Sequence, residues 1–238
     1  MSEYRHEHKY ICSERQLVCI QNRIEPYMSL DGNVGSNGRY TIRSLYFDTY
    51  DNACYRDNLA GVDPREKFRL RIYDGDASFI RLELKQKRHG MTRKLSCPID
   101  EALCRKLMSG EPLQPDETDE PLYRKLFLEQ STRLLQPKVI VEYERIPYVY
   151  RDGNVRVTFD TNIRSSVEIG GFLEKSVAAR PVMGTGYHVL EVKFDEFIPD
   201  FIHHAVQTDR LRQTAFSKYC LCRKYNLKAG LSGNGGLM

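Results

Sequence analysis

Two stretches of the 238-residue chain alternate charged and apolar side chains with a period of two, and this pattern limits the fold more than any other feature. In residues 67–73 and 79–87, Lys, Arg or Glu occupies nearly every second position, and Phe, Leu or Ile occupies most positions between them. Successive side chains of a strand point to opposite faces of a sheet. Each stretch is therefore predicted to be a strand with one charged and one apolar face. A turn at His89 and Gly90 predicts that residues 91–99 form a hairpin with the second stretch.

Weaker periodic patterns predict the remaining elements. Further strands are expected at residues 3–11, 40–48, 138–150, 154–160 and 187–194. Helices are expected after a Ser13 cap and at residues 100–108, 120–135, 200–207 and 216–225. No regular strand–helix–strand order appears, which favours an α+β fold with a largely antiparallel sheet. We expect one domain over residues 1–227 and a flexible, Gly-rich tail over residues 228–238.

The composition narrows the environment and the class of partner. No run of eighteen apolar residues is present, so no membrane span is expected, and the polar residues 1–6 do not resemble a secretory signal. Seven cysteines without a Cys-x-x-Cys pair disfavour a disulfide framework and a zinc knuckle, and they predict a cytoplasmic protein. The net charge is only +4, which disfavours a protein that coats nucleic acid with one whole face. Any polyanion would therefore be bound by cations that gather locally.

The charged strand faces have two interpretations. They can simply face water, as one side of an antiparallel sheet often does. However, a Glu-x-Lys pattern recurs at residues 7–9, 83–85 and 191–193, and long strands of this kind can close into a barrel with the charges inside. Crowded cations need counter-ions. A phosphate chain provides them, since Arg and Lys both bind phosphate oxygens, and the carboxylates could hold a divalent cation that bridges phosphates. This interpretation predicts a metal-dependent site for triphosphate or longer chains.

The order and spacing of the motifs resemble the catalytic domain of the vacuolar transporter chaperone (VTC) type, the polyphosphate polymerases of the triphosphate tunnel metalloenzyme (CYTH-like) superfamily. The matching motifs, which lie between residues 5 and 218, are Arg5-x-Glu7-x-Lys9-Tyr10, Tyr46-Phe47-Asp48-Thr49, residues 67–73, Leu82-Glu83-Leu84-Lys85, Val155-Arg156-Val157 with Asp160-Thr161, Leu190-Glu191-Val192-Lys193 and Phe216-Ser217-Lys218-Tyr219. The resemblance implies a closed antiparallel eight-stranded β-barrel tunnel with helices packed outside.

The resemblance also implies roles for individual residues. The implied catalytic set is Arg69, Arg71, Lys85 and Arg156. The implied phosphate- or nucleotide-binding set is Lys9, Lys87, Lys94, Tyr143, Arg145, Ser217 and Lys218. Glu191, with Glu7, is implied to hold Mn²⁺ or Mg²⁺. Two positions depart from the family pattern, because Ala215 replaces a lysine and Lys87 replaces a histidine of the fungal polymerases. Loss of one cation could shift the preferred chain length or weaken polymerase activity.

The activity that the resemblance implies is transfer of the γ-phosphate of ATP onto a polyphosphate chain. The implied partners are ATP and inorganic polyphosphate or triphosphate, without nucleic acid, and a membrane-protein partner stays open because the fungal relatives work within membrane complexes. Two alternatives also stay open. One is an inorganic or nucleoside triphosphatase in the same tunnel, and the other is a non-catalytic module that binds polyphosphate or nucleotides. The sequence contains neither a P-loop nor a kinase-type catalytic loop.

Four further residues have interpretations of their own. Glu83 could either bind metal or pair with a nearby Lys or Arg, and the pattern does not decide between these roles. His6 and His8 alternate with the charged positions of the first strand, so their rings are expected to point away from the lumen. Asp48 is interpreted as a turn former rather than as a site residue.

Overall fold

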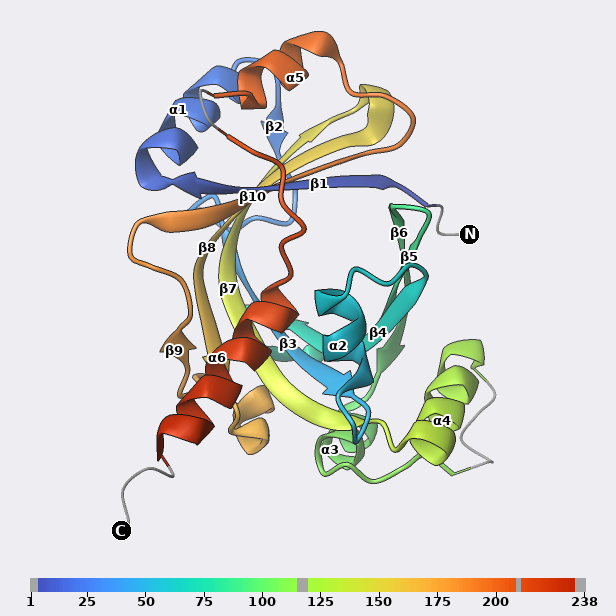
Figure 1. The fold of residues 1–238 in the computed structure, drawn as a ribbon. Helices are drawn as coiled ribbons and strands as arrows, with labels where there is room; N and C mark the ends of the chain where they lie inside the picture. Colours follow the sequence, from blue (N-terminus) through green and yellow to red (C-terminus); the bar gives the residue numbers. More distant parts are fainter. Residues whose placement is uncertain (1–3, 115–119, 209–210, 234–238) are drawn as a thin grey trace.

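The computed structural model describes residues 4–114, 120–208 and 211–233 of the chain (Figure 1). Its strands are β1 (His6–Ser13), β2 (Ser29–Leu30), β3 (Tyr40–Asp48), β4 (Arg65–Tyr73), β5 (Asp76–Arg88), β6 (Met91–Ile99), β7 (Gln136–Tyr150), β8 (Val155–Ser166), β9 (Arg180–Pro181) and β10 (Tyr187–Phe194). Its helices are α1 (Glu14–Ile24), α2 (Ala53–Leu59), α3 (Glu101–Met108), α4 (Pro121–Arg133), α5 (Asp200–Val206) and α6 (Lys218–Gly233), with short 3₁₀ turns η2 (Asp152–Asn154) and η3 (Ile169–Leu173).

The strands form one antiparallel sheet in the order β1-β10-β8-β7-β3-β4-β5-β6, while β2 pairs with β7 and β9 pairs with β8. This arrangement confirms the predicted α+β class and the antiparallel pairing. The predicted hairpin is also present, with Lys85 of β5 opposite Lys94 of β6. The sheet curls strongly, so that β1 and β6, its two edge strands, approach each other (Figure 1).

The prediction of a closed barrel is wrong, because the curled sheet is a half-barrel. In the described part of the chain, β1 and β6 are joined by a single backbone bridge, in which Arg5 and Thr92 exchange two hydrogen bonds of 2.9 Å. Further along β1, the segment before α6 takes the place of a barrel neighbour, since the Thr214 N–H donates to the Lys9 carbonyl at 2.8 Å. Alternation along a strand defines its two faces, but it does not determine whether distant edges pair.

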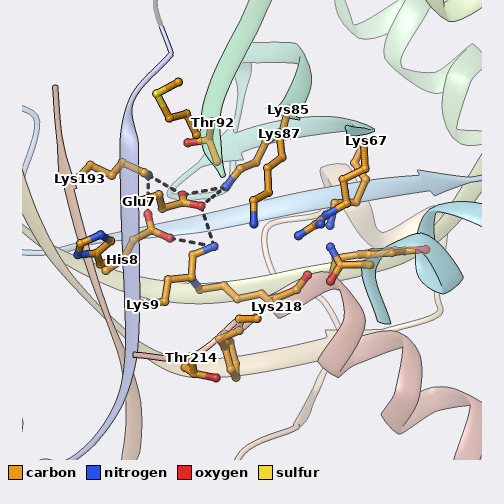
Figure 2. Close-up of a pocket in the computed structure, with 18 of the residues that line it drawn as sticks. Glu7, His8, Lys9, Lys67, Lys85, Lys87, Thr92, Lys193, Thr214 and Lys218 are labelled. Atoms are coloured by element: carbon orange, nitrogen blue, oxygen red, sulfur yellow. Dashed lines mark hydrogen bonds and ion pairs between the residues drawn. The ribbon is translucent and has the colours of Figure 1, made fainter. Parts of the chain in front are cut away.

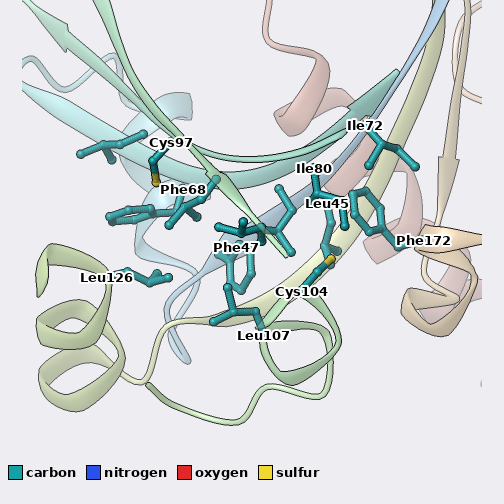
Figure 3. Packing of buried hydrophobic residues seen from close by; sticks show 14 of the residues in the cluster. Leu45, Phe47, Phe68, Ile72, Ile80, Cys97, Cys104, Leu107, Leu126 and Phe172 are labelled. Carbon is teal, nitrogen blue, oxygen red and sulfur yellow. The ribbon is translucent and has the colours of Figure 1, made fainter. Parts of the chain in front are cut away.

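Most helices cover the outer face of the sheet, as predicted. The apolar sides of β3 to β6 pack against α3 and α4, where Phe68, Leu82 and Leu107 are buried (Figure 3). On the other half of the sheet, β8 and β10 pack against α1 and α5. In contrast, α6 and α2 lie on the inner face. Tyr219 of α6 is buried against Tyr46 of β3, and the two ring centroids are 5.2 Å apart.

Asp48, at the end of β3, holds the two inner helices in place. Its carboxylate accepts hydrogen bonds from the backbone N–H groups of Cys54 at 2.8 Å and Tyr55 at 3.1 Å, and also from the Tyr219 hydroxyl of α6. Asp48 is fully buried. This contact explains why α2 begins there although it is only seven residues long, and it agrees with the structural role expected for Asp48.

Several boundaries differ from the sequence predictions. The Ser13 cap is confirmed, since Ser13 and Gln16 form a capping box at the start of α1. The two-residue strands β2 and β9 and the short helix α2 were not predicted, because elements of this length carry no periodic pattern. Helix α6 continues to Gly233, into the segment that was expected to be flexible, and residues 234–238 lie outside the described part.

Candidate functional site

A cavity of about 560 Å³ opens on the inner face of the sheet (Figure 2). Its walls are built from β1, from β3 to β7 with the β5–β6 turn, from β10, from the end of α2, and from the start of α6 with the segment that leads into it. Ten basic residues line it, namely Lys9, Arg65, Lys67, Arg69, Arg71, Lys85, Lys87, Arg145, Lys193 and Lys218. Glu7 and Glu191 are the carboxylates in the described lining. The strand pleat explains this convergence, because residues two apart on a strand share a face.

Glu7 lies at the centre of a group of lysines (Figure 2). The Lys85 ammonium lies 2.8 Å from each Glu7 carboxylate oxygen, and the Lys9 ammonium lies 2.9 Å from one of them. The Lys193 ammonium is 3.6 Å away. Burial alone would raise the pKa of Glu7, but the charges of Lys85 and Lys9 outweigh it and hold the pKa well below its usual range. Glu7 is therefore ionised at neutral pH.

Glu191 shares two of these lysines. Its carboxylate lies 2.5 Å from the Lys193 ammonium, 3.7 Å from that of Lys9 and 3.7 Å from the Arg145 guanidinium. Burial opposes the charged form, but the surrounding cations, Lys193 foremost, lower the pKa of Glu191 well below its ordinary value. Glu7 and Glu191 therefore form a pair of ionised carboxylates in an otherwise basic cavity.

Two further carboxylates lie on the same face of the sheet, outside the cavity lining, and hold its arginines. Glu83 is buried and accepts hydrogen bonds of 2.7 Å from Arg69 and from Lys94. Asp160 is also buried and accepts two hydrogen bonds from Arg145, at 2.7 and 2.8 Å. Paired guanidinium groups of this kind lose little freedom when they bind an anion. Of the two roles considered for Glu83, the ion pair is the one present.

Some cations of the cavity lack a matching charge. In the described ranges, no carboxylate lies within ion-pairing distance of Lys67, whose ammonium lies 5.2 Å from the centre of the Tyr219 ring. Burial lowers the pKa of Lys67, and burial likewise lowers the pKa values of Lys85 and Lys193 although each has a carboxylate partner. The cavity therefore carries a deficit of negative charge, which an anion with several charges would remove.

The N-terminal end of α6 adds polar groups to the cavity. Ser217 caps the helix, since its hydroxyl accepts a hydrogen bond from the Cys220 N–H at 3.3 Å. Lys218 is the first helical residue, and its ammonium is 2.5 Å from Asp160. Both side chains line the cavity, so the unpaired N–H groups of this helix start lie next to the basic residues. Helix N-termini favour bound anions such as phosphate.

The structure brings most of the predicted site residues together. The cavity lining contains Glu7, Lys9, Arg69, Arg71, Lys85, Lys87, Tyr143, Arg145, Glu191, Ser217 and Lys218. It does not contain Lys94 or Arg156. Lys94 pairs with Glu83 and its side chain is 47% exposed, whereas Arg156 forms an ion pair with Asp31, in the loop after β2.

Sequence reasoning missed other members of the site. Lys67 and Lys193 line the cavity, and the pleat could have identified both, since each is two positions from a predicted residue, Arg69 or Glu191. Asp160 was quoted only as part of a motif, and no pattern marked it as the partner of Arg145. His6 and His8 border the cavity, but the ring of His6 stacks on Phe194 with centroids 5.0 Å apart, and the ring of His8 meets that phenylalanine edge-on. Phe194 belongs to the apolar cluster that packs against α1 and α5, so both rings point away from the cavity, as predicted.

The carboxylate pair fits a hard divalent cation. Among the described residues, no three His, Cys, Asp or Glu side chains gather as a metal cage. Mg²⁺, however, is commonly held by one or two carboxylates with the remaining positions filled by water and by substrate phosphates. Glu7 and Glu191 meet this description, because both are ionised and they lie close enough together to share Lys9 and Lys193, which a bound cation would displace.

Within the described ranges, no helix has both the length and the apolar character needed to cross a bilayer.

A search of curated proteins finds no match. A solved structure from Hippeastrum, described as a putative adenylyl cyclase with a dominant triphosphatase activity, aligns with a TM-score of 0.53 at 14% identity, over 94% of this chain and 96% of that one. A putative adenylate cyclase from Bacillus halodurans aligns with a TM-score of 0.45 at 12% identity, over 96% of this chain and 90% of that one.

The comparison with family models identifies the family of the chain. The model of the VTC domain matches residues 4–226. The match begins just before β1 and ends within α6, so it includes every residue of the cavity lining. It confirms the resemblance that the sequence motifs indicated. The chain belongs to the VTC domain family.

Proposed function

We propose that this protein is a metal-dependent and ATP-dependent polyphosphate polymerase, which transfers the γ-phosphate of ATP to the terminal phosphate of a chain and releases ADP. The observation that carries the proposal is the charge of the cavity, where ten basic residues face two carboxylates. Phosphate chains have the charge density that such a lining requires, and both Arg and Lys bind phosphate oxygens.

Positioning and charge stabilisation would drive the transfer, without a protein nucleophile. Phosphoryl transfer passes through a state with negative charge spread over the equatorial oxygens, and fixed cations stabilise it. Arg69 and Arg145 are held in place by Glu83 and Asp160, so they can meet that charge without rearranging. Arg71 and Lys85 complete the proposed catalytic set in the cavity. Arg156 is engaged by Asp31 outside the lining, so we assign it no part in the transfer step.

Glu7 and Glu191 are the proposed ligands of Mn²⁺ or Mg²⁺. A bound ion of this kind neutralises phosphate oxygens and aligns the reacting groups. Lys9 and Lys193 now neutralise both carboxylates, and they would contact phosphate oxygens when the carboxylates bind a cation instead. The remaining proposed phosphate contacts are Lys87, Tyr143, Ser217 and Lys218.

The second candidate is a triphosphatase. The Hippeastrum protein, which shares the fold, is described as having dominant triphosphatase activity, and the same cavity could serve hydrolysis with water as the acceptor. Incubation of the wild type with ATP and Mn²⁺ or Mg²⁺, followed by separation of the products by size, distinguishes the two. Long polyphosphate supports the polymerase, and monomeric phosphate alone supports the hydrolase. Triphosphate binding without turnover under either metal would indicate a binding module.

A carboxylate variant tests the proposed metal ligands. Glu191→Ala is expected to abolish turnover and to leave much of the triphosphate affinity, because the lysines of the cavity stay in place. Glu144→Ala is the matched control, since Glu144 pairs with Arg39 at 2.9 Å and does not line the cavity. Normal turnover by Glu191→Ala would refute the assignment.

The proposed partners are ATP and inorganic polyphosphate or triphosphate, and the modest net charge argues against nucleic acid. The seven cysteines are all free thiols, which suits a reducing compartment, and we place the protein in the cytoplasm. A membrane-protein partner that receives the polymer stays a prediction of the family resemblance.

A further inference from the structure

The basic inner face of the sheet continues beyond the cavity, onto the far part of β5 and onto β6. Arg81 of β5 lies opposite Arg71 of β4, and Lys94 of β6 lies opposite Lys85 of β5. Directly opposed residues of neighbouring strands point to the same side of a sheet, with their Cβ atoms about 5 Å apart. Arg81 and Lys94 therefore share a face with the cations of the cavity, although neither lines it.

Arg81 is held in a defined orientation, but its charge is not neutralised. Its guanidinium donates to the Ser96 hydroxyl at 3.0 Å and to the Ser96 carbonyl at 3.2 Å, and it lies 5.6 Å from the centre of the Phe79 ring. Within the part of the chain that the structure describes, it forms no ion pair with a carboxylate. The side chain is half-buried, so an anion can reach it.

Lys94 links this cation to the cavity. Its ammonium lies 2.7 Å from the Glu83 carboxylate, which also binds Arg69 of the cavity wall. Because the Lys94 side chain is 47% exposed, it can contact a ligand from outside. Successive residues on one face of a strand are about 7 Å apart. Lys94 lies opposite Lys85, which is four positions along β5 from Arg81, so the two positions are about 14 Å apart and only a chain of several phosphates contacts both.

We infer that Arg81, together with Lys94, forms a second phosphate subsite outside the cavity. This subsite holds the units of an inorganic phosphate chain longer than triphosphate, while the cavity holds the reacting end. The inference rests on the proposed function, because it assumes that phosphates occupy the cavity. It goes further in assigning the chain-length preference to residues that the reacting phosphates do not touch.

Arg81→Gln tests the subsite by isothermal titration calorimetry with two probes, sodium triphosphate and a size-selected inorganic polyphosphate many units long. We expect the variant to bind the long chain about tenfold more weakly, as the loss of one charged contact predicts, and to bind triphosphate within about twofold of the wild type. Arg81→Lys retains the charge and should recover part of the affinity. Arg105→Gln on α3, which packs on the outer face, removes the same charge and should change neither affinity.

Each other outcome overturns the subsite. Equal losses for both probes, accompanied by a lower melting temperature, would show that Arg81 has only a structural role through Ser96. Unchanged affinity for the long chain would show that the chain does not reach Arg81. If the wild type binds neither probe, the proposed function and this inference fall together, whereas wild-type binding with an unaffected Arg81→Gln variant removes the subsite alone.

Discussion

Lys85 of β5 donates to both carboxylate oxygens of Glu7 in β1, at 2.8 Å each, and this ion pair connects the two ends of the curled sheet. Near it, the backbone bridge between Arg5 and Thr92 joins the edge strands. Because the described strands form no continuous ladder between β1 and β6, the ion pair contributes to the curl of the sheet as well as to the cavity. Glu7 thus both stabilises the curled sheet and lines the cavity.

Glu7→Gln should destabilise the protein. The substitution removes the charge that Lys9, Lys85 and Lys193 share inside a buried region, and breaking a buried ion pair typically costs about 3–5 kcal/mol. Urea unfolding followed by circular dichroism measures the change. Glu144→Gln, which breaks a partly exposed pair with Arg39, should cost less than about 1 kcal/mol. Similar losses of unfolding free energy in the two variants would show that the Glu7–Lys85 pair stabilises the protein no more than a surface ion pair does.

Lys67→Met is expected to separate stability from ligand binding. Lys67 is a buried cation whose pKa burial lowers, so its removal should raise the melting temperature of the ligand-free protein by about 2–4 °C, as for about 1 kcal/mol in a chain of this size. The same variant should lose much of the stabilisation that added triphosphate gives the wild type. Differential scanning fluorimetry with and without triphosphate records both effects. A lower melting temperature of Lys67→Met without ligand would contradict the claim that the cavity has too little negative charge for its cations.

Asp160→Asn should slow turnover although Asp160 does not line the cavity. Asp160 orients Arg145 and Lys218, and loss of such a supporting contact typically costs roughly tenfold to a hundredfold in rate. We expect the loss mainly in kcat, because the two cations remain present to bind the substrate. Asp195→Asn is a suitable control, since its partner Arg5 lies outside the cavity lining. An effect confined to the melting temperature would show that Asp160 serves the fold only.

As the pH rises, triphosphate binding should weaken at a lower pH than it would if the lysines of the cavity had ordinary pKa values. Burial lowers the pKa values of Lys67, Lys85 and Lys193 below their ordinary value of 10.5. These side chains therefore lose their charge as the pH rises through the lowered pKa, and the dissociation constant should increase there. Calorimetric titrations between pH 7 and about pH 10 follow the change. Lys67→Arg keeps its charge throughout this range, so its curve should be flatter, and identical curves would exclude Lys67 as a titrating contact.

The sequence predicted the faces of the strands better than it predicted their ends. Alternation placed Arg69 and Arg71 on the charged face of one strand and Lys85 on that of another, and the structure brings all three to one cavity. The same rule applies to Lys67, which is two positions before Arg69, and to Lys193, which is two positions after Glu191. It does not determine how far along a face the cavity extends, and for this reason Lys94 and Arg156 lie beyond it.

Long-range contacts account for the remaining differences. The single bridge between Arg5 and Thr92 depends on how strongly the whole sheet curls, and local patterns do not record this property. The ion pair between Asp31 and Arg156 joins a loop to a distant strand, and no spacing in the sequence relates them. The motifs of the family resemblance included Arg5 and Arg156, but the partners of these two residues emerged only from the fold.

The contact between Asp48 and Tyr219 has a consequence for how the site could evolve. Helix α6, which begins at Lys218 directly after Ser217, is attached to the end of β3 through this buried hydrogen bond. Substitutions around Asp48 would therefore tilt or shift one wall of the cavity while every lining residue stayed the same. Chain-length preference among related proteins could diverge through such remote changes, with no difference visible among the groups that touch the substrate.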